Sequence, residues 1–572
     1  MSIGSLISND TVTKDGVVYL ASHSNFAYSD GDRAERYVRD VIHGATDVSS
    51  DSPELVKYIR DWPSRYHLSR ERAHAYRSLA IPADATVLEI GCGCGSITRL
   101  LGEKAARVLA LEGSARRASI TRDRTRDLEN VTVLCASFEE VAFQSDFDIV
   151  ICNGVLEYAA LFVRHARPHQ RMIELLARLV RPGGSLIVAI ENKMGLRYFA
   201  SGREEHTNVR FDGLEGYAAF PSGPRTFGAL ELRHLLEEKF TSVETLLPLP
   251  DYKIPIALIR AELLDRANCA ELFANTAKHD YDTVERPLMH ERLVWRELAN
   301  NGLLRDFANS LFLIAGTKST MLLDRDWMGD IYSTSRTRDL AVRTTIRLAA
   351  DGAIVTEKGY LYESVGRRAV DPLRHTLQMS AWSEGPSIHT CVTRALMARS
   401  NEPIAARLRW PVELWWRVAC GDAPEPTSLT GSALDCNWQN VLVEGETARA
   451  IDTEWAWAET IDPAWLVFRS VMKFCGDEAA YVARWSGSAQ RLSPYRLMCI
   501  VCDIAGTEFG VARAWRAARH EVQFQRLACE KSLSEIRVVA QMFEPMWLRA
   551  FRSEASRWPR AVRRKLGALL RA

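Results

Sequence analysis

The sequence lacks several features that would assign it to a class at once. Among its 572 residues no run of about 18 apolar residues occurs, so no membrane span is expected. The N-terminal stretch MSIGSLISNDTVTKDG has no basic segment followed by an apolar one, and a secretory signal is therefore not expected. Lys and Arg total 73 against 72 Asp and Glu, and this balance gives no electrostatic reason for nucleic acid binding. These absences predict a cytoplasmic protein without a nucleic acid partner.

The twelve cysteines lack the spacing of a metal site. Cys499 and Cys502 form a C-x-x-C pair, but no second pair with matching spacing accompanies them. They lie in the apolar stretch LMCIVCDIAG, where free cysteine behaves as a small hydrophobic residue. We therefore expect buried thiols rather than metal or redox chemistry. The length of the chain exceeds what one hydrophobic core fills, and it predicts two or three domains.

From residue 86 onward, short apolar segments alternate with amphipathic ones. TVLEIG, RVLALEG, VTVLCAS, FDIVICNG and GSLIVAIEN are typical of buried strands, and helical patterns separate most of them. This alternation predicts a parallel sheet with right-handed crossovers, which is a Rossmann-like, doubly wound α/β fold. SLFLIAGT, residues 310–317, is expected to be the last strand of this unit.

Three glycines separate the first of these strands from the helix that follows it. VLEIGCGCGSITRLL places Gly91, Gly93 and Gly95 at this turn, where glycine allows positive φ and close approach of a ligand. The spacing G-x-G-x-G is tighter than the dinucleotide fingerprint and favours S-adenosylmethionine (SAM), with NAD or no cofactor as the alternatives. Glu112 ends the next strand, where its carboxylate can accept hydrogen bonds from both ribose hydroxyls.

Four more residues complete the expected SAM site, because ligands of doubly wound sheets bind at the carboxyl ends of the strands. Ser137 and Phe138 follow the third strand and are expected to flank the adenine. Asn153 ends the fourth strand, and Glu89 lies just before the glycines.

The glycine turn, Glu112 and FDIVICNGVLEY resemble the class I SAM-dependent methyltransferases. WPSRYHLSRERAHAYRSL, ENKMGLRYFASGREEHTNVRFDGLEGY, and RTFGALEL with LPLPDYKIP resemble a bacterial subfamily found with surface-polysaccharide and O-antigen synthesis. The resemblance covers residues from about 50 to 320. It implies transfer of a methyl group to a hydroxyl or terminal phosphate of a polysaccharide or its precursor, with a small-molecule acceptor as the minor alternative.

Methyl transfer from a sulfonium needs an in-line oxygen, and a hydroxyl acceptor gains from a general base. His206, in REEHT, is the first candidate because the pKa of histidine lies near working pH. Glu157 and His67 are the alternatives. A phosphate acceptor would need no base, and arginines would then contact its oxygens; the candidates are Arg197, Arg203 and Arg210.

A second motif, LDCNWQNVLVEGETARAIDTEW, occupies residues 434–455. Asp435, Asn440 and Asp452 follow the order of the protein-kinase fold, in which an Asp orients the acceptor hydroxyl and an Asn and a second Asp hold Mg²⁺. Before it, residues 342–362 alternate about an Asp-Gly pair, the signal of a hairpin, and Lys358 in this hairpin is the candidate phosphate-contacting lysine. IDTEW resembles the IDxE motif of small-molecule kinases.

The second motif also departs from that pattern. No glycine-rich loop precedes the hairpin, and Ala433 stands where a histidine is typical. Three interpretations therefore stay open: an active domain using ATP and Mg²⁺, a non-catalytic docking module, or an unrelated helical domain. The fusion resembles bifunctional kinase–methyltransferases that cap O-antigen chains.

The expected organisation has four parts. A lead-in covers residues 1–50, a methyltransferase domain 51–320, an α+β kinase-like or pseudokinase domain 325–500, and a basic helical tail 505–572. The last residues, ASRWPRAVRRKLGALLRA, carry only basic charges and predict either peripheral contact with an anionic membrane or a solvated end. The implied partners are a glycan or lipid-linked glycan and the glycosyltransferases that assemble it, at the inner membrane face.

Overall fold

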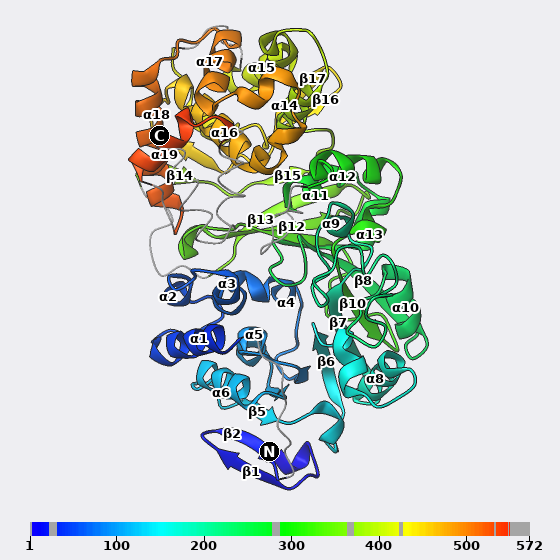
Figure 1. Ribbon diagram of the computed structural model, residues 1–572. Helices are drawn as coiled ribbons and strands as arrows, with labels where there is room; N and C mark the ends of the chain where they lie inside the picture. The colour runs from blue at the N-terminus through cyan, green and yellow to red at the C-terminus, as the bar shows by residue number, and fades with distance from the viewer. Residues whose placement is uncertain are drawn as a thin grey trace, which may run out of the picture.

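The computed structural model describes residues 3–21, 31–276, 287–362, 371–421, 427–530 and 534–546, together with Leu548. Within these ranges, one mixed sheet of 14 strands runs along most of the molecule, and a helical region covers one end (Figure 1). In spatial order its strands are β1 (Thr11–Lys14), β2 (Val17–Leu20), β5 (Val131–Cys135), β4 (Arg107–Glu112), β3 (Thr86–Ile90), β6 (Phe147–Asn153), β7 (Val180–Glu191), β10 (Ser310–Gly316), β8 (Ser242–Leu249), β9 (Ala257–Arg260), β11 (Trp327–Tyr332), β12 (Val342–Leu348), β13 (Ile354–Tyr360) and β15 (Met379–Ala381).

Strands β2, β5, β4, β3, β6 and β7 are parallel, and this confirms the expected Rossmann-like unit. The strands are buried on both faces, which explains their continuous apolar sequences. Residues 310–317 form a strand as expected, but β10 lies inside the sheet, antiparallel to both β7 and β8. The main helices of this unit are α1 (Asp32–Gly44), α5 (Ser96–Lys104), α6 (Ala115–Arg124), α8 (Pro168–Ala177) and α10 (Ala229–Glu237).

Residues 1–50 were expected to form a lead-in, and their described part packs onto this unit. Strands β1 and β2 form a hairpin about Asp15 and Gly16, and β2 adds to the edge of the sheet beside β5. Helix α1 packs against α6, where the buried Glu35 accepts a hydrogen bond from Arg117 at 3.0 Å. The strands are four residues each, too short for their periodicity to be recognised.

The sheet does not break between residues 320 and 325, where a domain boundary was expected. Strand β11 pairs with β9, so the β12–β13 hairpin continues the sheet of the first unit. Ile346 and Ile354 of this hairpin belong to the same hydrophobic cluster as Leu247 and Ile259. Pairing with β11 satisfies the free edge of β9, and the two units therefore share one backbone hydrogen-bond network.

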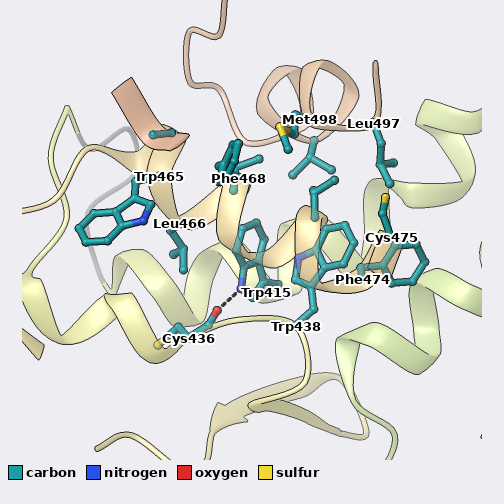
Figure 2. Close-up of a cluster of buried hydrophobic side chains, with 14 of the residues drawn as sticks. Trp415, Cys436, Trp438, Trp465, Leu466, Phe468, Phe474, Cys475, Leu497 and Met498 are labelled. Atoms are coloured by element: carbon teal, nitrogen blue, oxygen red, sulfur yellow. Dashed lines mark hydrogen bonds between the residues drawn. The ribbon is translucent and has the colours of Figure 1, made fainter. Parts of the chain in front are cut away.

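The C-terminal region is mostly helical and has its own hydrophobic core. Figure 2 shows Trp415, Trp438 and Phe474 packed together in this core, where the Trp415 indole N–H donates to the carbonyl oxygen of Cys436 at 2.6 Å. Its helices are α14 (Ile388–Met397), α15 (Ile404–Cys420), α16 (Pro463–Glu478), α17 (Pro494–Ile504), α18 (Val511–Ala528) and α19 (Glu535–Phe543), and its two small sheets pair β14 (Leu373–His375) with β18 (Trp455–Trp457) and β16 (Val441–Glu444) with β17 (Thr447–Ala450).

Helix α18 is not a tail, although residues 505–572 were expected to form one. It packs against α16, and Val522 and Phe524 are buried in the C-terminal core. The final basic segment, with its predicted membrane contact, lies outside the described residues. Across the described ranges no helix is both long and apolar enough to span a bilayer. All twelve cysteines are thiols; Cys502 is buried in α17 as expected, and Cys499 is only partly buried.

Shorter elements connect these parts, and those labelled η are 3-10 helices. They are η1 (Ile3–Ser5), α2 (Pro53–Val56), α3 (Trp62–Leu68), η2 (Arg70–Ala73), α4 (His74–Arg77), η3 (Phe138–Glu140), η4 (Leu156–Tyr158), α7 (Ala159–Phe162), α9 (Leu196–Phe199), η5 (Ala261–Asp265), α11 (Ala270–Thr276), α12 (Glu291–Asn300), α13 (Leu304–Phe307), η6 (Arg338–Leu340), η7 (Gly431–Asp435), η8 (Ala479–Arg484) and η9 (Gly487–Arg491).

Candidate active site

A cavity of about 440 Å³ opens at the carboxyl ends of β3, β4, β5 and β6. This edge of the sheet is the place where doubly wound folds bind ligands. Seven of the eight residues expected to contact SAM line the cavity: Glu89, Gly91, Gly93, Glu112, Ser137, Phe138 and Asn153. Short loops after four adjacent strands bring these residues together, because parallel strands end at one common edge.

The glycine turn has three residues with positive φ, at 70° for Gly91, 58° for Gly93 and 76° for Gly95. A Cβ atom at Gly91 would lie 2.5 Å from a methyl carbon of Val155, so this position has no room for a side chain. A Cβ at Gly93 would meet no atom within 4 Å, because this part of the turn faces the cavity. Gly95, the eighth residue, lies at the N-cap of α5 and does not line the cavity.

Glu112 is buried at the tip of β4 and is held by backbone amides. Its carboxylate accepts hydrogen bonds from the N–H of Gly93 at 2.8 Å and of Ser114 at 2.9 Å. The glycine turn and the carboxylate therefore fix one another at the wall of the cavity. A carboxylate has about four lone-pair sites, so Glu112 can still accept from two ribose hydroxyls.

Glu89 and Asn153, which also line the cavity, are each held by a hydrogen bond. The Thr98 hydroxyl donates to Glu89 at 2.6 Å, and burial raises the pKa of this carboxyl to about 7. The Tyr76 hydroxyl donates to the amide oxygen of Asn153 at 3.0 Å. These contacts fix the polar groups before any ligand binds.

Three ionisable groups lie close together in the lining of the cavity, and we call this part of it the acceptor end. It is lined by Glu157 in η4, Glu191 at the tip of β7 and His206 in the loop after α9. A carboxylate oxygen of each glutamate and a ring nitrogen of the histidine lie within 4.8 Å of one another. The structure thus brings together two of the expected catalytic residues, His206 and Glu157. Glu191 was missed, although its place at the carboxyl end of an apolar strand was a usable signal.

Neighbouring charges set the ionisation at the acceptor end. Burial raises the pKa of Glu157. Burial acts in the same direction on Glu191, but the Lys253 ammonium at 2.8 Å lowers the pKa of this carboxyl overall. Burial alone would lower the pKa of His206, and the carboxylates of Glu157 and Glu204 raise it well above the usual value. Lys253 and Glu204 were also missed, because they lie in irregular loops.

His67, the third expected base, also lines the cavity, together with Trp62 and Tyr66 of α3. Helix α3 begins at a capping box, in which the Asp61 carboxylate accepts the N–H of Ser64 at 3.0 Å. The structure therefore places His67 in the cavity wall, outside the group formed by Glu157, Glu191 and His206. The three arginines proposed for a phosphate acceptor do not line the cavity: Arg197, Arg203 and Arg210.

Asp435, the fourth expected catalytic residue, lies in a second cluster apart from this cavity. Its carboxylate accepts the backbone N–H groups of Glu454 at 2.8 Å and Trp455 at 2.9 Å. The Asn440 side-chain amide donates to the backbone oxygen of Asp435 at 3.0 Å. Burial, and then the nearby Asp452 and Glu454 carboxylates, raise the pKa of Asp435.

Lys358 reaches the same cluster from the β12–β13 hairpin. Its ammonium contacts the carboxylate of Asp452 and lies 3.3 Å from that of Glu454. Arg336 also contacts Glu454, from the segment where a glycine-rich loop would stand in a kinase. The structure thus brings Lys358, Asp435 and Asp452 together from three separate segments. Glu454, the acid of the IDxE motif, joins them, although the sequence analysis gave it no role.

Residues 88–188 match the family model described as a methyltransferase domain. Among curated proteins, the ubiquinone biosynthesis O-methyltransferase of Coxiella burnetii (strain Dugway 5J108-111) is 28% identical over 138 residues, 23% of this chain and 56% of that protein. The trans-aconitate 2-methyltransferase of Azoarcus sp. (strain BH72) is 30% identical over 135 residues, 22% of this chain and 49% of that protein. Each alignment therefore spans about half of the relative's length.

Among solved structures, the N-methyltransferase NodS from Bradyrhizobium japonicum WM9 is 19% identical and covers 32% of this chain and 86% of its own, with a TM-score of 0.24. The family match contains the glycine turn, Glu112 and Asn153. The chain thus carries a SAM-dependent methyltransferase domain, as the sequence predicted. Glu191, His206 and the second cluster lie outside the matched residues.

Proposed function

We propose that this enzyme transfers the methyl group of SAM to an oxygen of a surface polysaccharide or its precursor. One observation carries the proposal: a single cavity is lined by the glycine turn, by Glu112 and by a cluster of three ionisable groups. The glycine turn and Glu112 suit the methionine and ribose portions of the donor. The acceptor end then receives the attacking oxygen, in line with the sulfonium carbon.

A hydroxyl acceptor must lose its proton as its oxygen attacks the methyl carbon. Glu157, Glu191 and His206 are the groups placed to favour this loss. The O–CH₃ bond forms while the S–CH₃ bond breaks, and S-adenosylhomocysteine leaves. The names of the curated relatives support oxygen as the nucleophile, since one of them is an O-methyltransferase.

The choice of a glycan acceptor rests on the resemblance of the residues outside the family match. It is tested by mass spectrometry of the surface glycan from cells with and without this protein, where loss of a methyl or methyl-phosphate group is expected. Transfer of label from [methyl-¹⁴C]SAM to a small carboxylic acid or phenol, but not to glycan, would contradict this acceptor class. Absence of SAM binding by calorimetry would contradict the methyltransferase function itself.

We further propose that the second cluster binds MgATP on a kinase-like domain. The convergence of Lys358, Asp435 and Asp452 supports this, since these residue types position phosphates, the acceptor hydroxyl and Mg²⁺ in kinases. The contact of Lys358 with Asp452 and the presence of Arg336 favour the alternative of a non-catalytic docking module. Calorimetry with MgATP separates the two, because only the first requires saturable nucleotide binding.

The proposed partners are a lipid-linked glycan and the glycosyltransferases that extend it. This assignment places the enzyme in the cytoplasm, at the inner membrane face. Its test is affinity purification of the tagged full-length chain from membrane and soluble fractions. Recovery of glycosyltransferases with the membrane fraction is expected, and their absence from both fractions would contradict the assignment.

A further inference from the structure

We propose that Glu157, Glu191 and His206 bind one divalent metal ion at the acceptor end of the cavity. The proposal rests on the proposed methyl transfer and states how the acceptor is held. The ligand atoms come from three segments and all lie within 4.8 Å of one another. Two carboxylates and one imidazole form a donor set that suits first-row metals such as Mn²⁺, Fe²⁺ and Zn²⁺.

Two buried oxygens of this cluster have no partner. Among the described residues, neither Glu157 Oε2 nor Glu191 Oε2 has a hydrogen-bond partner, and the two side chains are 1% and 2% exposed. A buried carboxylate oxygen without a partner is costly, because it has lost its contacts with water. An ion between the two carboxylates would satisfy both oxygens together.

The third ligand is oriented for coordination by a carboxylate behind it. Nδ1 of His206 lies 2.9 Å from Oε1 of Glu204, and Nε2 points toward Glu157, 3.7 Å from its Oε1. Glu204 is itself fixed by the backbone N–H groups of His206 and Thr207, each at 2.7 Å. In metal sites the ligating histidine is commonly held in this way, with one ring nitrogen on a carboxylate and the other on the metal.

Glu191 is held in a similar way by groups behind it. Its Oε1 accepts hydrogen bonds from the Lys253 ammonium at 2.8 Å and the Tyr252 hydroxyl at 3.2 Å. The carboxylate is thereby fixed through one oxygen, and Oε2 stays available. A metal-binding carboxylate is commonly held in this way, with one oxygen hydrogen-bonded to the protein and the other left for the metal.

The charges at this end also leave room for a dication. Four carboxylates lie beside two cations and His206, so the negative charges outnumber the positive ones even when His206 is protonated. One divalent ion adds the missing positive charge and takes the place of the proton on His206. The carboxylates are Glu157, Glu191, Glu204 and Glu205, and the cations are Lys253 and Arg197.

Three protein ligands leave coordination positions open toward the cavity. A vicinal diol or an α-hydroxy acid can fill two of them, so the inferred acceptor class is a chelating hydroxyl compound, such as the diol of a sugar ring. The ion lowers the pKa of the bound hydroxyl. The proton leaves to water as the O–CH₃ bond forms and the S–CH₃ bond breaks, and His206 acts as a neutral ligand instead of a general base.

The test uses full-length protein treated with a chelator and then dialysed. Mn²⁺ binding is followed by electron paramagnetic resonance and Zn²⁺ binding by calorimetry, with Mg²⁺ as a comparison. One ion per chain is expected. Glu157→Gln, Glu191→Gln and His206→Asn should abolish this binding, and Glu204→Gln should weaken it by about 10- to 100-fold.

Glu139→Gln is the matched control, because Glu139 is an exposed acid that lines the cavity outside the cluster. Its metal affinity should equal that of the wild type. The proposal is overturned if the wild type binds no ion at millimolar concentration, or if the three ligand variants bind as well as the control. SAM affinity, measured on the same samples, tests the methyltransferase function and the folding of each variant separately.

Discussion

Lys358 and Asp452 are in direct contact although 94 positions separate them in the chain. One lies in strand β13 of the extended sheet, and the other follows β17 in the helical region. Burial would lower the pKa of Lys358, but the carboxylates of Asp452 and Glu454 raise it. The contact joins the hairpin and the second motif, which lie far apart in the sequence.

Removal of the Asp452 charge should therefore affect nucleotide binding. If the second cluster binds MgATP, Asp452→Asn should abolish Mg²⁺-dependent ATP binding, since this residue would hold the metal. Asp351→Asn is the matched control, because Asp351 is an exposed residue of the β12–β13 turn. Isothermal calorimetry with ATP, with and without Mg²⁺, measures both variants. A wild-type protein that shows no binding at millimolar MgATP would favour the docking module.

Glu112→Gln should weaken SAM binding by roughly 10- to 150-fold, a loss of about 1.5–3 kcal/mol for a hydrogen bond to a charged group. The shape of the side chain is kept, but the ribose hydroxyls then face a neutral amide. Glu129→Gln, an exposed acid between α6 and β5, serves as the control. Calorimetry with SAM checks the result. Equal affinities in both variants would contradict the position assigned to the ribose.

Trp415→Phe should destabilise the C-terminal core. The phenyl ring cannot donate to the Cys436 carbonyl, and the unsatisfied oxygen costs about 1–3 kcal/mol of unfolding free energy. Trp410→Phe is the control on the same helix, because Trp410 is 51% exposed whereas Trp415 is fully buried. Urea unfolding followed by circular dichroism measures both. Equal urea midpoints for the two variants would contradict a stabilising role of the Trp415 hydrogen bond.

His74 should make the protein less stable at mildly acidic pH. Burial lowers its pKa to about 3, and its Nδ1 lies 3.0 Å from the Pro255 carbonyl oxygen. An unfolded histidine titrates near pH 6.5, so between these values the unfolded chain binds one more proton than the folded one. The contribution of His74 to the free energy of unfolding is fully present above pH 6.5, and it falls by about 1.4 kcal/mol for each pH unit below that value.

The check is a comparison of His74→Asn with the wild type at pH 7.5 and 5.5. The Asn amide can donate to the same carbonyl but does not titrate, so the difference in unfolding free energy between the two pH values should shrink by about 1.4 kcal/mol. His43→Asn, at an exposed position, should keep the wild-type difference. If the difference in unfolding free energy between the two pH values is the same in His74→Asn as in the wild type, groups other than His74 cause the loss of stability at low pH.

The sequence by itself determined the elements whose signals are local. Glycines at positive φ and apolar runs of five to seven residues fix β3, the turn after it and β4. The tips of parallel strands must meet at one edge, so the common location of Glu89, Glu112 and Asn153 followed from the order of elements alone. The hairpin that carries Lys358 was likewise encoded in its alternation and its Asp-Gly turn.

Only the tertiary structure decided which distant segments meet. Strand β10 enters the sheet between β7 and β8, and β11 pairs with β9, because edge strands take the partner that best satisfies their backbone groups. The same long-range packing brings Lys253 and Glu204 to the acceptor end from loops that have no periodicity. Such contacts depend on the free energy of the whole fold, which no short stretch of sequence contains.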